Sequence, residues 1–160
     1  MGSRVTEHSI DELAARLRAW LDEDERIARL AGAGSWHVEC DYTPGECPPG
    51  CKCWHRRIEG DGSPGITIYN EGGHDEDQAD HITRHDPRWV LAEVSAKRAL
   101  LDEALGWEHH EAGDQFYSCR ARPDLPDWVE SGRCDCGRDA RVLAVLTHLA
   151  QPYLEEQQRA

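Results

Sequence analysis

The strongest constraint on this sequence comes from its seven cysteines, which fall in two groups. Both groups lie in stretches rich in proline, glycine and charged residues, where regular helices and strands are not expected. Such stretches bury too little apolar surface to offset the conformational entropy lost when they become ordered. Coordination of zinc by four sulfur or nitrogen ligands would order them, so the cysteines predict one or two structural zinc ions.

The first predicted zinc site lies in a single short loop. Its ligands are Cys40, Cys47, Cys51 and Cys53. The spacing of Cys51 and Cys53 is tighter than the usual Cys-x-x-Cys pair, which makes it harder for both thiolates to reach one ion. His55 is therefore the reserve ligand of this site.

The second predicted zinc site uses the three later cysteines, Cys119, Cys134 and Cys136. Three thiolates need a fourth ligand, and His109 and His110 are the nearest candidates. The segment from Cys134 to Cys136 stands directly before a predicted helix, whose positive end favours deprotonated thiols.

The expected location of the protein favours metal binding by the cysteines over disulfide bonds. The N-terminus has no apolar run typical of a signal peptide, and no segment approaches the ~20 apolar residues of a membrane span. We therefore expect a cytoplasmic protein with no membrane partner, whose thiols stay reduced. Free cysteines without metal are the main alternative, and a disulfide framework is a more distant one.

The charge of the chain restricts its partners. With 31 acidic against 18 basic side chains, the formal net charge is -13. This charge repels a phosphate backbone, so direct binding of nucleic acid is not expected. An acidic surface is compatible with simple solubility, with attraction to a basic protein partner, or with mimicry of a nucleic acid.

Periodic apolar residues predict a single α+β domain over 1–160 that is mainly α. Helices are expected at about 9–32, 87–105 and 139–151, the last ended by Pro152, with a shorter helix at 75–84. Ser9 and Glu12 form a capping box at the first helix start, and Asp86 is an N-cap before Pro87. The apolar stripe of the first helix consists of Ile10, Leu13, Leu17, Trp20, Leu21, Ile27 and Leu30.

The predicted β structure is small. The segments 36–40 and 66–69 are expected to be strands that pair with each other, and 116–119 is a further possible strand. The remaining stretches, 41–65 and 107–137, are expected to be the two cysteine-containing loops.

A separate group of histidines and carboxylates suggests a different metal site. Its members are His74, Asp77, His81, His85 and Asp86, with His81 and His85 one helical turn apart. An open coordination position there would suit a metal-dependent hydrolase. A zincin is excluded because an isoleucine stands where its general-base glutamate belongs. The favoured alternative is that these side chains cap and cross-link the helix junction at Asp86, and no catalytic residue is assigned.

The segment His81-Ile-Thr-Arg-His-Asp-Pro87, followed by residues 90–98, is similar to one in a known family. The turn from Glu71 to His74 and the closing segment that begins at Arg141 fit the same pattern. On these residues the chain resembles an uncharacterised family of small acidic proteins from actinobacteria and their phages. The resemblance implies such an origin, with the host cytoplasm as the location of a phage-encoded member, and implies no activity.

Three functions remain as hypotheses. The first is a zinc-stabilised binding or regulatory protein that acts through a protein partner. The second is the metal-dependent hydrolase, and the third is a nucleic-acid mimic.

Overall fold

The computed structural model describes residues 9–40, 55–60, 63–69, 75–109, 119–122, 125 and 130–159. The chain forms two compact units, one made of Met1–Leu21 with Lys97–Ala160 and the other of Asp22–Ala96. That the two units make one domain stays a prediction. The fold class is confirmed as α+β and mainly α, with four helices and one small antiparallel sheet in the described residues.

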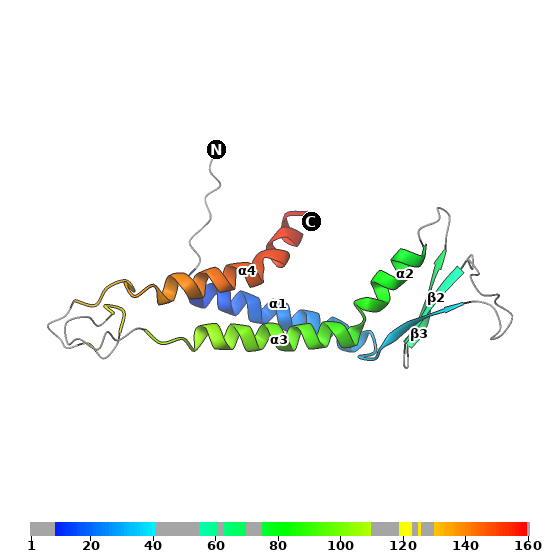
Figure 1. Cartoon of the computed structure of the whole chain (residues 1–160), viewed down its shortest axis with the longest axis horizontal. Helices are drawn as coiled ribbons and strands as arrows, with labels where there is room; N and C mark the ends of the chain where they lie inside the picture. Colours follow the sequence, from blue (N-terminus) through cyan, green and yellow to red (C-terminus); the bar gives the residue numbers. More distant parts are fainter. Residues whose placement is uncertain are drawn as a thin grey trace. The chain divides into compact units, whose positions relative to one another are not determined.

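The first unit is built from three helices that share one apolar core. They are the first part of α1 (Ile10–Leu30), the last part of α3 (Pro87–Leu105), and α4 (Arg138–Arg159) (Figure 1). The bounds of α1 and α3 agree with the predicted ranges to within two residues. The buried core residues are Leu13, Ala14, Leu17, Leu101, Val142, Leu146 and Ala150.

The capping box predicted at the start of α1 is present in both directions. The Ser9 backbone N–H donates to Glu12 Oε2 at 3.1 Å, and the Glu12 N–H donates to Ser9 Oγ at 3.2 Å. Two backbone donors that the helix cannot satisfy internally are thus satisfied by its own side chains.

The predicted end of the last helix at Pro152 is wrong, because α4 continues to Arg159. Proline removes one hydrogen bond from a helix and kinks it, and Figure 1 shows α4 changing direction in its last, red part. Tyr153 and Leu154 pack against the core just after the proline. Tyr153 also stacks on Trp20 with ring centroids 5.0 Å apart. These contacts stabilise the helix beyond the proline.

The second unit contains a three-stranded antiparallel sheet in the order β1-β2-β3. Its strands are β1 (Trp36–Cys40), β2 (His55–Gly60) and β3 (Ser63–Tyr69). Helix α2 (Asp75–Arg84), predicted with these bounds, packs against all three strands. Ile58 of β2 and Ala79 of α2 are both buried.

Two predictions about the sheet are wrong. The strands 36–40 and 66–69 do not pair with each other, because β2 lies between them. β2 and the start of β3 also fall inside 41–65, which was expected to be a loop. β2 has a single large apolar residue, Ile58, so its sequence lacks the apolar alternation that predicts a strand.

The predicted apolar stripe of α1 is buried only in its first part. Ile27 and Leu30 are 52% and 75% exposed, whereas Ala28 is buried. The buried face of the helix therefore shifts after Asp24, where the spacing of the stripe is interrupted.

Asp86 is a buried carboxylate that joins β1 to α3. Its Oδ1 accepts the Trp89 N–H at 2.7 Å, as predicted for an N-cap, and its Oδ2 accepts the Trp36 N–H at 3.1 Å. Both oxygens are thus used to satisfy backbone donors.

We expect Asp86→Ala to lower the free energy of unfolding by about 2 to 3 kcal/mol. The substitution removes a helix cap and leaves the Trp36 N–H without an acceptor in a partly buried place. Urea unfolding followed by circular dichroism measures the loss. Asp80→Ala, an exposed change in α2, is the control, and equal stability of the two variants would contradict the assigned role.

Among the described residues, no helix is long and apolar enough to cross a membrane.

Candidate metal centre

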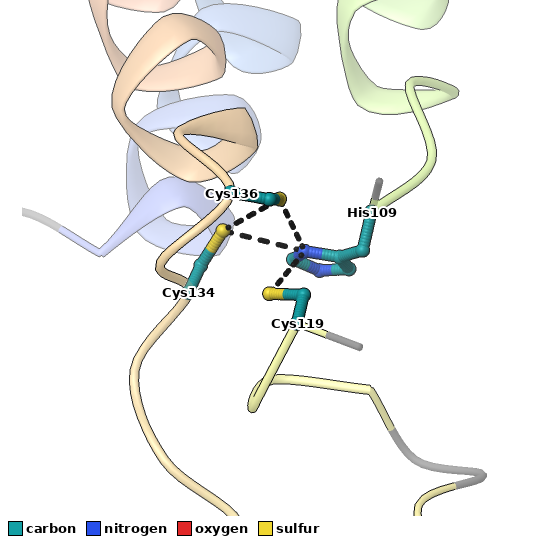
Figure 2. Close-up of side chains that lie close together, drawn as sticks. All are labelled: His109, Cys119, Cys134 and Cys136. Atoms are coloured by element: carbon teal, nitrogen blue, oxygen red, sulfur yellow. Dashed lines mark hydrogen bonds between the residues drawn. The ribbon is translucent and has the colours of Figure 1, made fainter. Parts of the chain in front are cut away.

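The loop between α3 and α4 brings four potential metal ligands together. His109 follows the end of α3, Cys119 lies in the middle of the loop, and Cys134 and Cys136 precede α4 (Figure 2). The ligand atoms of these four residues all lie within 4.8 Å of one another. None of the three cysteines forms a disulfide.

One nitrogen of the histidine lies close to all three cysteine sulfurs. His109 Nδ1 lies 3.3 Å from the Sγ atoms of Cys119 and Cys134 and 3.6 Å from that of Cys136. The sulfurs of Cys134 and Cys136 are 3.3 Å apart. In a tetrahedral zinc site, bonds of about 2.0 to 2.3 Å place ligand atoms about 3.5 to 3.8 Å from each other. The three sulfur–nitrogen distances and this sulfur–sulfur distance are therefore within a few tenths of an ångström of those expected around such an ion.

The cysteine loops provide backbone hydrogen bonds to the sulfurs. Cys119 Sγ accepts the N–H groups of Ala121, Cys136 and Asp135, and Cys134 Sγ accepts those of Asp139 and Cys136. Gly137 has a φ of 79°, a left-handed conformation that glycine adopts without strain. The chain can therefore turn directly from Cys136 into α4.

An acidic side chain lies on the far side of the His109 imidazole. Its Nε2 lies 3.9 Å from Asp139 Oδ1, in the first turn of α4. A carboxylate facing the second nitrogen of a histidine is the usual arrangement around metal ligands, because it sets the ring orientation and raises the basicity of the ligand nitrogen.

Arg138 connects the two ends of the loop. Its Nε–H donates to the Trp107 carbonyl oxygen and its Nη2 donates to the Leu105 carbonyl oxygen, both at 2.8 Å, while Nη1 donates to Asp139 Oδ1 at 2.9 Å. A guanidinium thus satisfies carbonyl groups at the end of α3 and holds the carboxylate that faces His109.

A family model described as a family of unknown function, DUF6221, matches residues 10–156. The chain belongs to this family. No curated protein and no solved structure matches the DUF6221 chain significantly. The match confirms the prediction that the chain belongs to an uncharacterised family. It assigns no activity to the chain.

The structure describes only some of the predicted metal ligands of this DUF6221 chain. The second cysteine group is brought together, and His109 lies beside it as a fourth potential ligand. Cys47, Cys51, Cys53, His74 and His110 lie outside the described residues, and only the backbone is described at Cys40 and His55. The first zinc site stays a prediction. Residues 116–118 of the possible third strand also lie outside, and Cys119 itself is not in a strand.

The described members of the alternative histidine site have local partners. The rings of His81 and His85 are 4.5 Å apart, and His85 Nδ1 donates to the His81 carbonyl oxygen at 2.8 Å. Asp86 caps α3, and Asp77 is exposed. Among the residues described, these side chains form no group of three potential ligands. The hydrolase site stays a prediction that involves His74.

The thiols of Cys119 and Cys134 differ in acidity. Burial raises the pKa of Cys119, but the hydrogen bonds from Ala121, Cys136 and Asp135 outweigh it, so this pKa lies below its ordinary value. Burial raises the pKa of Cys134, and the neighbouring thiols of Cys136 and Cys119 raise it further despite the Asp139 N–H. Without metal, Cys119 is the thiol that ionises more readily of the two. The helix start alone does not lower the pKa of Cys134.

Sequence reasoning missed Arg138 and Asp139 as supporting residues. Their position directly after Cys136 and Gly137, at the start of a predicted helix, was the available signal. It also missed a small exposed group on the sheet, formed by His37 and Glu39 of β1 and Glu59 of β2. Arg57 pairs with Glu59 at 2.8 Å within β2, and the strand register places His37 opposite Glu59 and Glu39 opposite Arg57. This group is therefore part of a network of charges on two neighbouring strands.

We expect Arg138→Lys to destabilise the chain by about 1 to 3 kcal/mol and to weaken metal binding about tenfold. Lysine has no planar fork that can donate to the Leu105 and Trp107 carbonyl groups at the same time. Arg141→Lys, an exposed change one turn later in α4, is the matched control. Thermal unfolding and a competitive zinc titration measure the two effects, and equal behaviour of the variants would count against the bridging role.

Proposed function

We propose that the chain is a zinc-stabilised binding protein, in which one structural zinc ion is held by His109, Cys119, Cys134 and Cys136. The observation that carries the proposal is the convergence of one imidazole nitrogen and three sulfurs within 4.8 Å. The four soft ligands suit zinc, and thiolate sites of this kind are typical of structural metal.

The ligand set favours a structural role over a catalytic one. Catalytic zinc sites usually have three protein ligands and keep the fourth position for water or substrate. Here four protein side chains are close enough together to fill all four positions of a tetrahedral site, which supports a structural ion. The ion would cross-link the loop between α3 and α4, where the described residues form neither helix nor strand.

Metal analysis of protein purified without added metal tests the zinc proposal. We expect at least one zinc ion per chain, and a second if the earlier cysteine group also binds. Cys134→Ser and Cys136→Ser should each lose one ion, whereas Asp135→Ser, which changes the exposed residue between them, should lose none. Zinc content unaffected by both cysteine substitutions would disprove the site.

Cobalt provides a second test that reports geometry. Co²⁺ bound in place of zinc by three thiolates and one imidazole gives intense tetrahedral ligand-field bands and sulfur charge-transfer bands. His109→Ala should change these bands, because it replaces a nitrogen ligand with water or leaves three thiolates. Unchanged bands would remove His109 from the site.

The proposed partner is a basic protein, bound through the acidic surface. The support is the net charge of -13. The resemblance in the sequence suggests an actinobacterial or phage setting for this regulator. A pull-down from an actinobacterial lysate should return a basic protein at low salt and lose it at high salt. Recovery of nothing at low salt would argue against the partner, and displacement of the captured protein by DNA would instead favour nucleic-acid mimicry.

A further inference from the structure

The three sulfurs of the metal centre differ in their access to solvent. Cys119 is buried, with 3% of its surface exposed, whereas Cys134 and Cys136 are only partly buried. Asp135, which lies between them in the sequence, is exposed. With zinc bound, all three sulfurs would be thiolates, because a thiol loses its proton when it binds the ion. Access therefore decides which sulfurs a small oxidant reaches, and it favours those of Cys134 and Cys136.

The same two sulfurs are close enough to form a bond with each other. Cys134 Sγ and Cys136 Sγ are 3.3 Å apart, against about 2.05 Å in a disulfide. Figure 2 shows both side chains on the segment that leads into α4, whereas Cys119 and His109 come from other parts of the loop. The chain itself keeps the two sulfurs adjacent when the ion leaves, but Cys119 depends on the ion to stay beside them. Cys134 and Cys136 are thus the pair that would join.

A disulfide between these two cysteines would be reversible. Residues two positions apart close a small ring, and departures from relaxed geometry make a disulfide easier to reduce. Strained or exposed disulfides are the labile and regulatory ones in proteins. The geometry therefore suits a bond that forms and breaks with the supply of oxidant.

We propose that the metal centre is a redox switch, in which a peroxide oxidises Cys134 and Cys136 to a disulfide and the zinc ion is released. The switch rests on the zinc centre proposed above and adds its regulation. The oxidant is hydrogen peroxide or a small organic peroxide, and the reductant that reverses the step is a dithiol.

The reaction needs two electrons and two protons. One thiolate attacks an oxygen of hydrogen peroxide, so that the O–O bond breaks and a sulfenic acid and a hydroxide ion form. The second thiolate attacks the sulfenic sulfur, so that the S–S bond forms, the S–O bond breaks and a second hydroxide ion leaves. The two hydroxide ions take up two protons and become water. Two electrons have then passed from the sulfurs to the peroxide, and a dithiol returns them.

Oxidation would open the cross-link without replacing it. It would leave His109 and Cys119, and two ligands fall short of the four that a structural zinc ion requires. The new bond lies within the segment before α4, so it does not connect that segment to the middle of the loop. The buried helical core and the hydrogen bonds of Arg138 to Leu105 and Trp107 involve no sulfur. The switch would therefore release the loop at Cys119 and leave the helices in place.

Titration of the zinc-loaded full chain with hydrogen peroxide tests the proposal. A chromogenic chelator should report one released ion for every two thiols lost, and the mass of the chain should fall by two hydrogen atoms. Peptide mapping should find the bond between Cys134 and Cys136, and the helical circular dichroism signal should persist. Dithiothreitol with added zinc should restore both the thiols and the ion.

The outcomes separate the switch from the zinc centre itself. Chain that contains no zinc before peroxide is added would disprove the centre and the switch together. Bound zinc that stays in place while peroxide is consumed would overturn the switch alone. The same holds for a disulfide that joins Cys119 to Cys134 or Cys136, or for sulfinic and sulfonic acids as the only products.

Cys136→His is the variant that isolates the pair. It keeps a set of two thiolates and two imidazoles, which also suits structural zinc, but it cannot form the proposed bond. Zinc release by peroxide should be slower by at least about tenfold than in the native chain. Asp135→Ser, which keeps both thiols, is the matched control and should release zinc at the native rate. Equal rates in Cys136→His and the native chain would overturn the switch, and the disulfide map of the native chain decides whether or not this variant binds zinc.

Discussion

Stripping the metal from the Cys119, Cys134, Cys136 and His109 centre is expected to lower the melting temperature by at least ~10 °C. A structural zinc ion contributes an apparent ~10 to 16 kcal/mol in small zinc domains, against a total stability of about 5 to 15 kcal/mol for a typical domain. For a chain of this size, each kcal/mol corresponds to roughly 2 to 4 °C. Even a fraction of the zinc contribution therefore gives a large shift.

Differential scanning calorimetry with and without a strong chelator measures this effect. Cys134→Ser should melt at the lower temperature already, and the chelator should change it little. Asp135→Ser should keep the high melting temperature and the sensitivity to chelator, because it leaves all four ligands in place. A native melting curve that stays the same after the chelator has removed the zinc would mean that the ion does not stabilise the fold.

Leu146→Ala is expected to lower the free energy of unfolding by about 2 to 5 kcal/mol. Leu146 is fully buried in α4, and its neighbours in the core come from α1 and α3. Removal of its isobutyl group leaves a cavity that three packed helices cannot easily close. The variant should unfold at a clearly lower urea concentration.

Leu100→Ala is the matched control for this substitution. The same atoms are removed from α3, but Leu100 is 51% exposed, so the loss should stay below about 1 kcal/mol. Urea unfolding of both variants by circular dichroism provides the comparison. If the two substitutions had the same cost, α4 would not form part of the core described for this unit.

The metal centre and the helical core are linked through Arg138. The three-helix core contains buried residues of α3 and α4, and the guanidinium then connects the end of α3 to the start of α4. The ends of the two helices thereby place His109 beside Cys134 and Cys136. We infer that metal binding adds order mainly to the loop and less to the helices, because the helices have apolar contacts of their own.

The helix starts were accessible from sequence because their chemistry is local. Ser9 with Glu12 and Asp86 with Pro87 satisfy backbone donors within one helical turn, so the residues that decide the structure are adjacent in the chain. The bounds of α3 followed for the same reason, and the second cysteine group could be recognised from sequence as a set of potential metal ligands. Cysteine and histidine in loops have a coordination chemistry that does not depend on the fold.

Other features depended on contacts between distant residues. Pro152 is a local signal to end a helix, but Tyr153 packs on Trp20, which lies far away in the sequence, and the helix continues. β2 has no apolar alternation of its own and is a strand because it pairs with β1 and β3. The selection of His109 as the fourth ligand likewise required the position of α3 relative to α4.

The sequence by itself therefore determined the helix caps, the mainly helical class of this chain and which cysteines are potential metal ligands, because each follows from groups that act over one turn or from side-chain chemistry alone. Only the tertiary structure decided that His109 and three sulfurs converge, that Ile27 stays exposed, and that Trp36 lies against Gly60 and donates its N–H to Asp86. These features depend on packing between segments far apart in the chain. Local sequence patterns do not indicate which distant segments are in contact.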